Sequence, residues 1–221
     1  MAAVKGSRSY SSSLRVHQAQ TTRAAVLDAA LDLFVHQGYS ATTIDQIAAR
    51  AGVSKPTVFA AVGNKATVLK VVRDRAIAGD DDPAPVARRD HVQEIEHEAD
   101  LHRAASLLAH HLTEVAGRYA AINNVLRAAA DTNDAAIREL WAAEEAERLT
   151  GARHWIRVLA AKQPHGTSRS ENNAAADLLW LLMSPENYQR LVNQRRWTPQ
   201  RYEQWLTDAI AGLVLRPRPA R

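Results

Sequence analysis

The 221-residue chain contains no cysteine. Disulfide bonds, thiolate metal sites and cysteine nucleophiles are therefore excluded together. No stretch approaches the roughly 18 consecutive apolar residues that a membrane-spanning helix requires. Residues 1–20 are rich in serine and basic residues but lack the apolar segment of a secretory signal. These absences predict a cytoplasmic protein.

Motifs of several enzyme classes are also missing. His97 and His102 are five residues apart, which places them roughly 140° apart around a helix and prevents them from sharing a zinc ion. Residues 166–170 lack the second glycine of a nucleophile elbow, and there is no glycine-rich phosphate loop. We therefore expect no catalytic residue, no metal site and no cofactor.

Positive charge is concentrated in the N-terminal third of the chain. Residues 1–75 contain 10 Lys and Arg against 4 Asp and Glu, a net charge of +6, whereas the remaining residues carry −2. Such a concentration is expected where a protein contacts nucleic-acid phosphates. A solubilising N-terminal segment is the alternative on composition alone.

Residues 43–65 predict two short helices joined by a tight turn. Thr43 begins a capping-box pattern, and Gly52 supplies the left-handed residue that ends the first helix. Ser54 is suited to cap the second helix, with Pro56 inside its first turn. Apolar residues at helical spacing give both helices a face for a small core. These are the components of a helix-turn-helix.

Residues 22–72 resemble the DNA-binding domain of the tetracycline-repressor (TetR) family of bacterial transcriptional regulators. The matching features, in order, are a helix from Ala24 to His36, Gly38-Tyr39, Thr42-Thr43, Ile47-Ala48, Ala51-Gly52-Val53-Ser54, Pro56-Thr57 and Asn64-Lys65. The resemblance implies an all-α fold. A three-helix helix-turn-helix head would be followed by a C-terminal helical bundle for effector binding and dimerisation.

The resemblance also implies DNA contacts for eight residues: Thr42, Thr43, Ser54, Lys55, Pro56, Thr57, Phe59 and Lys65. Lys55 would donate to a guanine edge, and Pro56 would touch a thymine methyl group. Thr43, Thr57 and Lys65 would contact phosphates and set the register. Phe59 stands where the family usually has tyrosine, so a phenolic donor is missing. Solvent-facing caps and charges, and a place in the core for Phe59, are the alternatives.

The domain organisation follows from changes in sequence pattern. Residues 1–20 show no helical period, and a segment without a role is the alternative to a basic arm that contacts DNA. Gly79 to Pro85 cannot continue a helix. The expected units are a flexible arm (1–20), the DNA-binding domain with the start of a connecting helix (21–78), a linker (79–90), the effector-binding and dimerisation domain (91–215) and a tail (216–221).

The spacing of apolar residues predicts that the C-terminal domain is helical throughout. We expect a helix over Asp100–Ala116, a separate helix around Ile122–Ala129 and a long helix from about Asn133 to Lys162. Ser184-Pro185 and Thr198-Pro199 combine an N-cap residue with a first-turn proline, so each begins a further helix.

Two late segments suggest a partner subunit. Residues 174–183 are apolar nearly all round, and the last helix carries an unbroken apolar stripe. The predicted dimer-interface residues are Trp180, Tyr202, Trp205, Leu206, Ile210 and Leu213. A homodimer would match a palindromic operator, whereas a fully intramolecular bundle is the alternative.

Polar and aromatic side chains on otherwise apolar helix faces are candidates for an effector pocket. They are His111, Asn123, Arg127, Trp141, Glu144, Arg148, Trp180 and Met183. Together they could line a mixed cavity for a small organic effector of unknown identity. Simpler interpretations exist, because Glu144 and Arg148 also form an ordinary i, i+4 pair.

We therefore expect a homodimeric, sequence-specific DNA-binding transcriptional regulator. In the simplest case it is a repressor that leaves its operator when the effector binds. A DNA-binding dimer without effector control is one alternative. An all-α enzyme or small-molecule-binding protein with a coincidental helix-turn-helix is the other.

Overall fold

The computed structural model describes residues 7–80, 88–132, 134–163 and 168–214. Within these ranges the chain is helical and has no strand, which confirms the all-α prediction. None of the described helices is long and apolar enough to cross a membrane. The elements are α1 (Ser7–Ala41), α2 (Ile44–Ala51), α3 (Lys55–Ala61), α4 (Lys65–Ala78), α5 (Asp90–His97), α6 (Leu101–Ala130), α7 (Ala135–Ala160), α8 (Arg169–Leu182), α9 (Pro185–Tyr188), the π-helix η2 (Gln189–Gln194) and α10 (Pro199–Val214).

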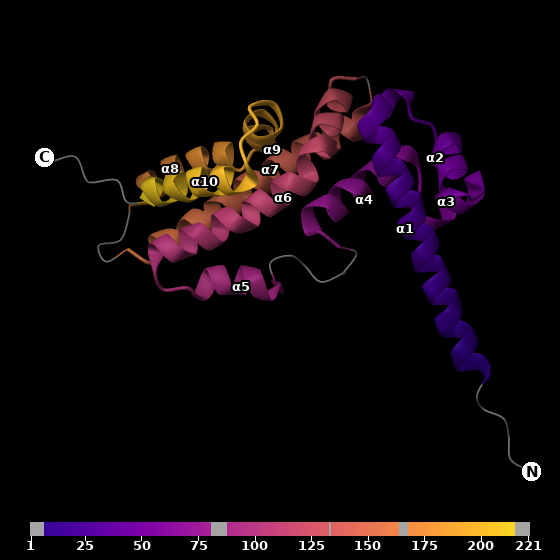
Figure 1. Cartoon of the computed structure of the whole chain (residues 1–221), viewed down its shortest axis with the longest axis horizontal. Coiled ribbons are helices and arrows are strands. Elements are labelled where there is room, and N and C mark those ends of the chain that lie inside the picture. Colours follow the sequence, from indigo (N-terminus) through magenta and orange to yellow (C-terminus); the bar gives the residue numbers. More distant parts are fainter. Residues whose placement is uncertain (1–6, 81–87, 133, 164–167, 215–221) are drawn as a thin grey trace, which may run out of the picture.

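The helices form a head and an elongated body. In Figure 1, α2, α3 and the C-terminal half of α1 lie at one end, α5 to α10 make up the body, and α4 lies between them. The long helix α6 packs against α1, α4, α5, α7, α9 and α10. One apolar core includes Phe34, Ile47 and Val58 of the head together with Ile122 and Leu126 of α6. The head therefore shares its core with the near end of the body.

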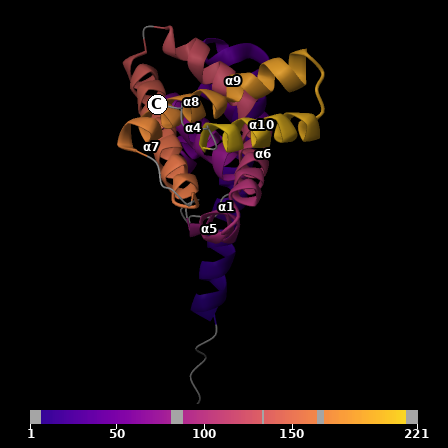
Figure 2. The same cartoon turned by 90° about the vertical axis from the view of Figure 1, so that its left-hand side faces the viewer.

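A second apolar core fills the far part of the body. Its buried residues come from α5, α6, α7, α8 and α10, with Leu108, Ile156 and Leu206 among those with almost no exposed surface. This core fixes α8 and α10 against α6 and α7, and Figure 2, which views the molecule from this side, shows these helices toward the viewer.

The first helix is longer than predicted. α1 begins at Ser7, so the structure corrects the expectation of an irregular segment over residues 7–20; residues 1–6 of the predicted arm lie outside the described residues. Residues 14–20 are exposed, and α1 extends away from the rest of the molecule in Figures 1 and 2. A helix whose described side chains, residues 14–20, face solvent needs no apolar period. Residues 7–20 also have no proline or glycine to stop a helix that later residues anchor.

The predicted break within residues 116–122 is also wrong. α6 is continuous from Leu101 to Ala130 and keeps buried residues on both sides of Gly117. A Cβ at Gly117 would lie 3.4 Å from the Tyr188 hydroxyl, so tertiary packing compensates for the weak helix propensity of glycine. Other boundaries agree with prediction: α4 spans Lys65–Ala78, and Gly79 ends it in the left-handed region with φ 89°. Most of the predicted linker and all of the predicted tail, residues 81–87 and 216–221, lie outside the described residues.

Candidate DNA-binding surface and interior polar network

The helix-turn-helix is built by local capping. The Thr43 side chain accepts a hydrogen bond from the backbone N–H of Gln46, and the Gln46 side chain completes the capping box. Gly52, at φ 68°, donates its N–H to the last carbonyls of α2. Ser54 then caps α3 by accepting from the backbone N–H of Thr57. The short segment between the caps fixes the position of α3 relative to α2, as the sequence predicts.

The outward surface of α3 contains three of the predicted DNA-contacting residues. Lys55, Pro56 and Phe59 are all exposed, and 47% of the surface of Phe59 is accessible. The core alternative for Phe59 is therefore excluded. The Lys55 ammonium lies 2.9 Å from the Asp45 carboxylate of α2, and half of its side-chain surface remains open to solvent. Lys55, Pro56 and Phe59 thus share one solvent-facing side of α3.

Three hydroxyl groups lie near that face, and two of them, on Thr43 and Ser54, cap helices. Thr43 and Ser54 are exposed, and Thr57 is half-buried. The Ser54 and Thr57 oxygens are 2.7 Å apart and share one hydrogen bond. Each hydroxyl oxygen has further hydrogen-bonding capacity, so the phosphate contact of Thr57 and the DNA contact of Ser54 stay predictions.

Thr42 has a different role from the one predicted. Its side chain is fully buried, where it donates to the Gly38 carbonyl at 2.8 Å and accepts from Gln37 at 3.2 Å. Because Gly38 has φ 82° and the helix kinks there, Thr42 stabilises the end of α1. A buried side chain cannot reach a DNA phosphate, so the prediction for Thr42 is wrong.

Lys65 is also drawn into the protein. Its ammonium donates to the Tyr39 carbonyl at 3.0 Å and lies 4.2 Å from the centre of the Tyr39 ring. The Tyr39 hydroxyl donates in turn to Asp134 at 3.1 Å. Burial, assisted by Asp134, raises the pKa of Tyr39. These contacts connect α4, α1 and the start of α7, a link that spacing in the sequence does not reveal.

Comparison with known proteins identifies this head. The profile described as "Bacterial regulatory proteins, tetR family" matches residues 26–72. Residues 26–72 of the chain are thus similar to the DNA-binding segment of the TetR family. Its relatives include the HTH-type transcriptional regulator SrpR of Pseudomonas putida, 46% identical over 55 residues, which is 25% of this chain and 26% of SrpR. A second relative is the uncharacterized HTH-type transcriptional regulator YdeS of Bacillus subtilis (strain 168), 48% identical over 48 residues, which is 22% of this chain and 24% of YdeS. The chain thus matches only about a quarter of the length of these relatives.

Solved structures resemble the fold of most of the chain. NalD of Pseudomonas aeruginosa, described as the secondary repressor of the MexAB-OprM multidrug efflux pump, is 20% identical with a TM-score of 0.63, over 88% of this chain and 95% of NalD. A transcriptional regulator from Rhodococcus sp. Rha1 is 15% identical with a TM-score of 0.59, over 88% of this chain and 99% of its own. At these identities the comparison establishes the fold.

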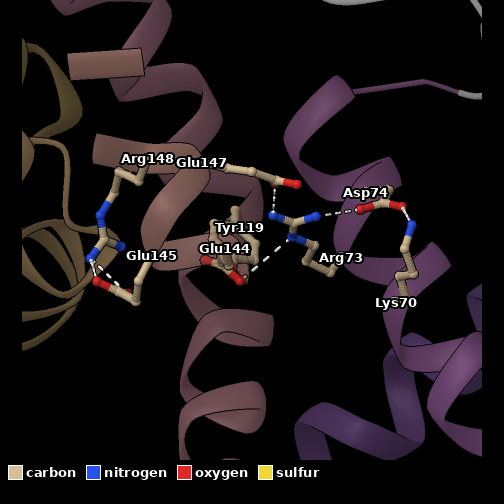
Figure 3. Close-up of polar contacts among 8 residues, drawn as sticks. All are labelled: Lys70, Arg73, Asp74, Tyr119, Glu144, Glu145, Glu147 and Arg148. Atoms are coloured by element: carbon tan, nitrogen blue, oxygen red, sulfur yellow. Dashed lines mark hydrogen bonds and ion pairs between the residues drawn. The ribbon is translucent and has the colours of Figure 1, made fainter. Parts of the chain in front are cut away.

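A buried charge network joins α4 to the body of the molecule. Arg73 of α4 donates to Glu147 of α7 at 2.6 Å and to Asp74 at 2.7 Å, and its Nε lies 3.5 Å from Glu144 (Figure 3). Arg73 and Glu144 are both buried. Tyr119 of α6 donates to the other oxygen of Glu144. Burial raises the pKa of Glu144, although Tyr119 and Arg73 act in the opposite direction.

The structure does not gather the eight predicted pocket residues into one place. Glu144, Asn123, Arg148 and Trp180 lie inside the body, and each has a buried polar atom without a hydrogen-bond partner among the described residues. Arg148 pairs with Glu145 at 2.6 Å and lies 5.3 Å from the Trp180 ring. The simple i, i+4 pair with Glu144 is therefore not formed. These four residues remain the interior candidates.

The other four candidates lie elsewhere. Arg127 is half-exposed and pairs with Glu186 at 3.2 Å, so it faces the surface. Trp141 packs against the core shared with the head, and Met183 lies beside Gly151. His111 lines a separate cavity near the end of α4. Helix periodicity places these side chains on apolar faces, but only packing decides which faces meet.

Three of the six predicted dimer-interface residues are buried inside their own chain. Tyr202, Leu206 and Ile210 have at most 1% exposed surface and fill the core of their own chain, so they cannot form a subunit interface. Trp180, Trp205 and Leu213 are only partly buried. Leu178 and Leu181 of α8, which helical spacing did not single out, are 37% and 54% exposed. The apolar composition of residues 174–183 was the available signal, but it did not show which side faces outward.

Proposed function

We propose that this chain is a homodimeric DNA-binding transcriptional regulator that represses from a palindromic operator and leaves it when a small organic effector binds. The observation that carries the proposal is the exposed face of α3. Lys55, Pro56 and Phe59 project from a capped helix-turn-helix within the segment that matches the family. Lysine can donate to guanine in the major groove, and an apolar group can meet a thymine methyl.

The exposed apolar side of α8 supports a homodimer. Leu178 and Leu181 are one helical turn apart and uncovered in the single chain, although the opposite side of α8 is buried through Ala175, Ala176 and Leu179. A helix that is apolar on both sides is stable in water only when both are covered. A second copy related by two-fold symmetry would cover the open side and present two recognition helices to the two half-sites.

The interior polar groups support control by an effector. Glu144, Arg148, Asn123 and Trp180 have unpaired polar atoms inside the body, where an organic ligand with polar groups would satisfy them. Glu144 also contacts Arg73 of α4. A ligand at Glu144 would thus compete for a contact that holds the connecting helix.

Binding of the purified full-length chain to DNA tests the function. Fluorescence anisotropy would compare its own upstream intergenic DNA with a scrambled duplex across a salt series. We expect tight binding to one palindromic stretch, two subunits per site and a steep loss of affinity with salt. Equal, weak binding to both duplexes, with selection from a random library also yielding no preferred sequence, would refute the proposal.

A further inference from the structure

A cavity lies where α4 ends against α5 and α6. Its volume is about 470 Å³, within the usual range of roughly 300–1,000 Å³ for small-molecule sites. Arg89, His91, His111 and Arg118 supply positive or hydrogen-bonding groups, and Ile95 and Leu107 supply apolar surface. The described part of the chain contains no group of three His, Asp or Glu side chains able to hold a metal ion. The lining therefore favours an organic ligand.

Two arginines of this cavity also hold the end of α4. Arg89 donates to the Ala78 carbonyl at 2.6 Å. Arg118 donates to the carbonyls of Ala76 and Ile77 at 3.2 and 3.5 Å. The last carbonyls of a helix have no partner within it and carry partial negative charge. Guanidinium groups of Arg89, just before α5, and of Arg118 in α6 therefore cap the end of α4.

The carboxylates that line the cavity pair closely with Arg89 but not with Arg118. Asp80 binds Arg89 through two hydrogen bonds of 2.7 and 2.9 Å. Glu114 is 3.7 Å from Arg118, beyond hydrogen-bond distance, and Glu94 is exposed. The contacts of Arg118 with described residues, at 3.2, 3.5 and 3.7 Å, are long for a guanidinium, whose charged hydrogen bonds are typically about 2.7–2.9 Å. Arg118 is thus the cation that a ligand could recruit.

Two histidines of the cavity, His91 and His111, could also donate hydrogen bonds to an anion. The His91 and His111 rings are 5.1 Å apart. Burial, followed by the neighbouring His91 and Arg118, lowers the pKa of His111 to about 4. A neutral imidazole can donate one hydrogen bond to a carboxylate without a desolvated charge.

We propose that this cavity binds a small organic carboxylate through Arg118 and His111, with its apolar part against Ile95 and Leu107. Binding draws Arg118 away from the carbonyls of Ala76 and Ile77 and loosens the end of α4. The effect on DNA binding rests on the proposed function above, whereas carboxylate binding does not.

Isothermal titration calorimetry of the full-length chain tests the site. The probes are benzoate, hexanoate and 1-naphthoate, each compared with its neutral amide. We expect at least one carboxylate to bind, with its amide about tenfold weaker or more, because charged hydrogen bonds are lost. Arg118→Gln should weaken carboxylate binding by a similar factor. Arg127→Gln, an arginine of the same helix outside the cavity, should leave it unchanged.

A second variant separates loss of the site from loss of the fold. Leu107→Trp fills part of the cavity without removing a charge and should also weaken binding, while circular dichroism confirms a folded chain. Failure of all three carboxylates to bind, equal binding of the amides, or equal effects of the Arg118 and Arg127 variants would overturn the proposal.

The link to DNA is measured separately, by anisotropy with the selected operator. Adding the carboxylate should lower the DNA affinity of the unaltered chain by about tenfold, the scale of typical allosteric coupling. Adding it to the Arg118→Gln variant should not change the DNA affinity of that variant. Carboxylate binding without this loss would overturn the proposed link to α4. If the chain binds no DNA, the proposed function fails, but calorimetry still decides whether the site exists.

Discussion

Arg73 Nε and Glu144 Oε2 lie 3.5 Å apart between α4 and α7, and neither atom has a hydrogen-bond partner among the described residues. The same guanidinium donates to Glu147 and Asp74 through its other nitrogens. Buried charges of this kind are costly unless they are paired and fully hydrogen-bonded. Opposite charges therefore hold α4 against α7, although Arg73 Nε and Glu144 Oε2 do not form a hydrogen bond with each other.

Arg73→Met should lower the free energy of unfolding by about 3–5 kcal/mol, because it leaves the Glu144 carboxylate buried without its cation. Urea unfolding followed by circular dichroism measures the change. Arg75→Met is the matched control on the same helix. Its guanidinium is more exposed and pairs with Asp28, so we expect a loss of at most about 1 kcal/mol. Equal losses would contradict the assigned importance of Arg73. Adding Glu144→Gln to Arg73→Met should recover part of the loss.

Lys55→Ala should relax specificity at one base pair of the operator by about 1–3 kcal/mol, because Lys55 is predicted to donate to a guanine edge. The measurement compares the affinities of single-base operator variants. Lys70→Ala serves as the control, since Lys70 is an exposed lysine of α4 that pairs with Asp74. If both variants reduce the affinity for every sequence by the same factor, Lys55 contacts phosphate and does not read a base.

Lys65→Ala should weaken binding to all DNA sequences alike and should also destabilise the head. The expected loss of stability is about 1.5–3 kcal/mol, because a charged hydrogen bond to the Tyr39 carbonyl disappears. Thermal unfolding and the salt dependence of DNA affinity are both measured. A reduced salt slope with unchanged stability would show that Lys65 acts only on phosphate.

Leu181→Glu should dissociate the proposed homodimer, because it puts a charge on the uncovered side of α8. Analytical ultracentrifugation across a concentration series measures the state. Leu31→Glu is the control: Leu31 is 37% exposed on α1, away from α8. An unaltered chain that is monomeric at all concentrations, or a Leu181→Glu variant that still dimerises as tightly as the control, would refute the assigned interface.

His111 should make the protein less stable in mild acid. Its folded-state pKa of about 4 lies below the ordinary 6.5, so the unfolded chain takes up the proton first as the pH falls. The free energy of unfolding is therefore unaffected by His111 above pH 6.5 and decreases by roughly 1–3 kcal/mol as the pH falls from 6.5 toward 4. His111→Gln should flatten the stability profile in this window, whereas His17→Gln at an exposed position should not. A parallel profile for His111→Gln and the unaltered chain would contradict this assignment.

The helix-turn-helix could be predicted from the sequence because its geometry is local. Thr43, Gly52, Ser54 and Pro56 each determine a cap or turn through contacts within a few residues, and the apolar spacing decides which side of each short helix is buried. The same local rules placed the ends of α4 and the start of α10. They could not place α1, whose first turns lack any packing signal.

Only the tertiary structure decided which sides of the helices pack against one another. Periodicity gave α10 an apolar stripe, but packing against α6 buried Tyr202, Leu206 and Ile210 and left Leu178 and Leu181 of α8 outside. Long-range contacts also took Lys65 to Tyr39 and Arg73 to Glu144. Local sequence determines caps, turns and the apolar side of a helix, because these depend on neighbours along the chain. Which sides meet depends on the simultaneous packing of all the helices, which no single stretch of sequence contains.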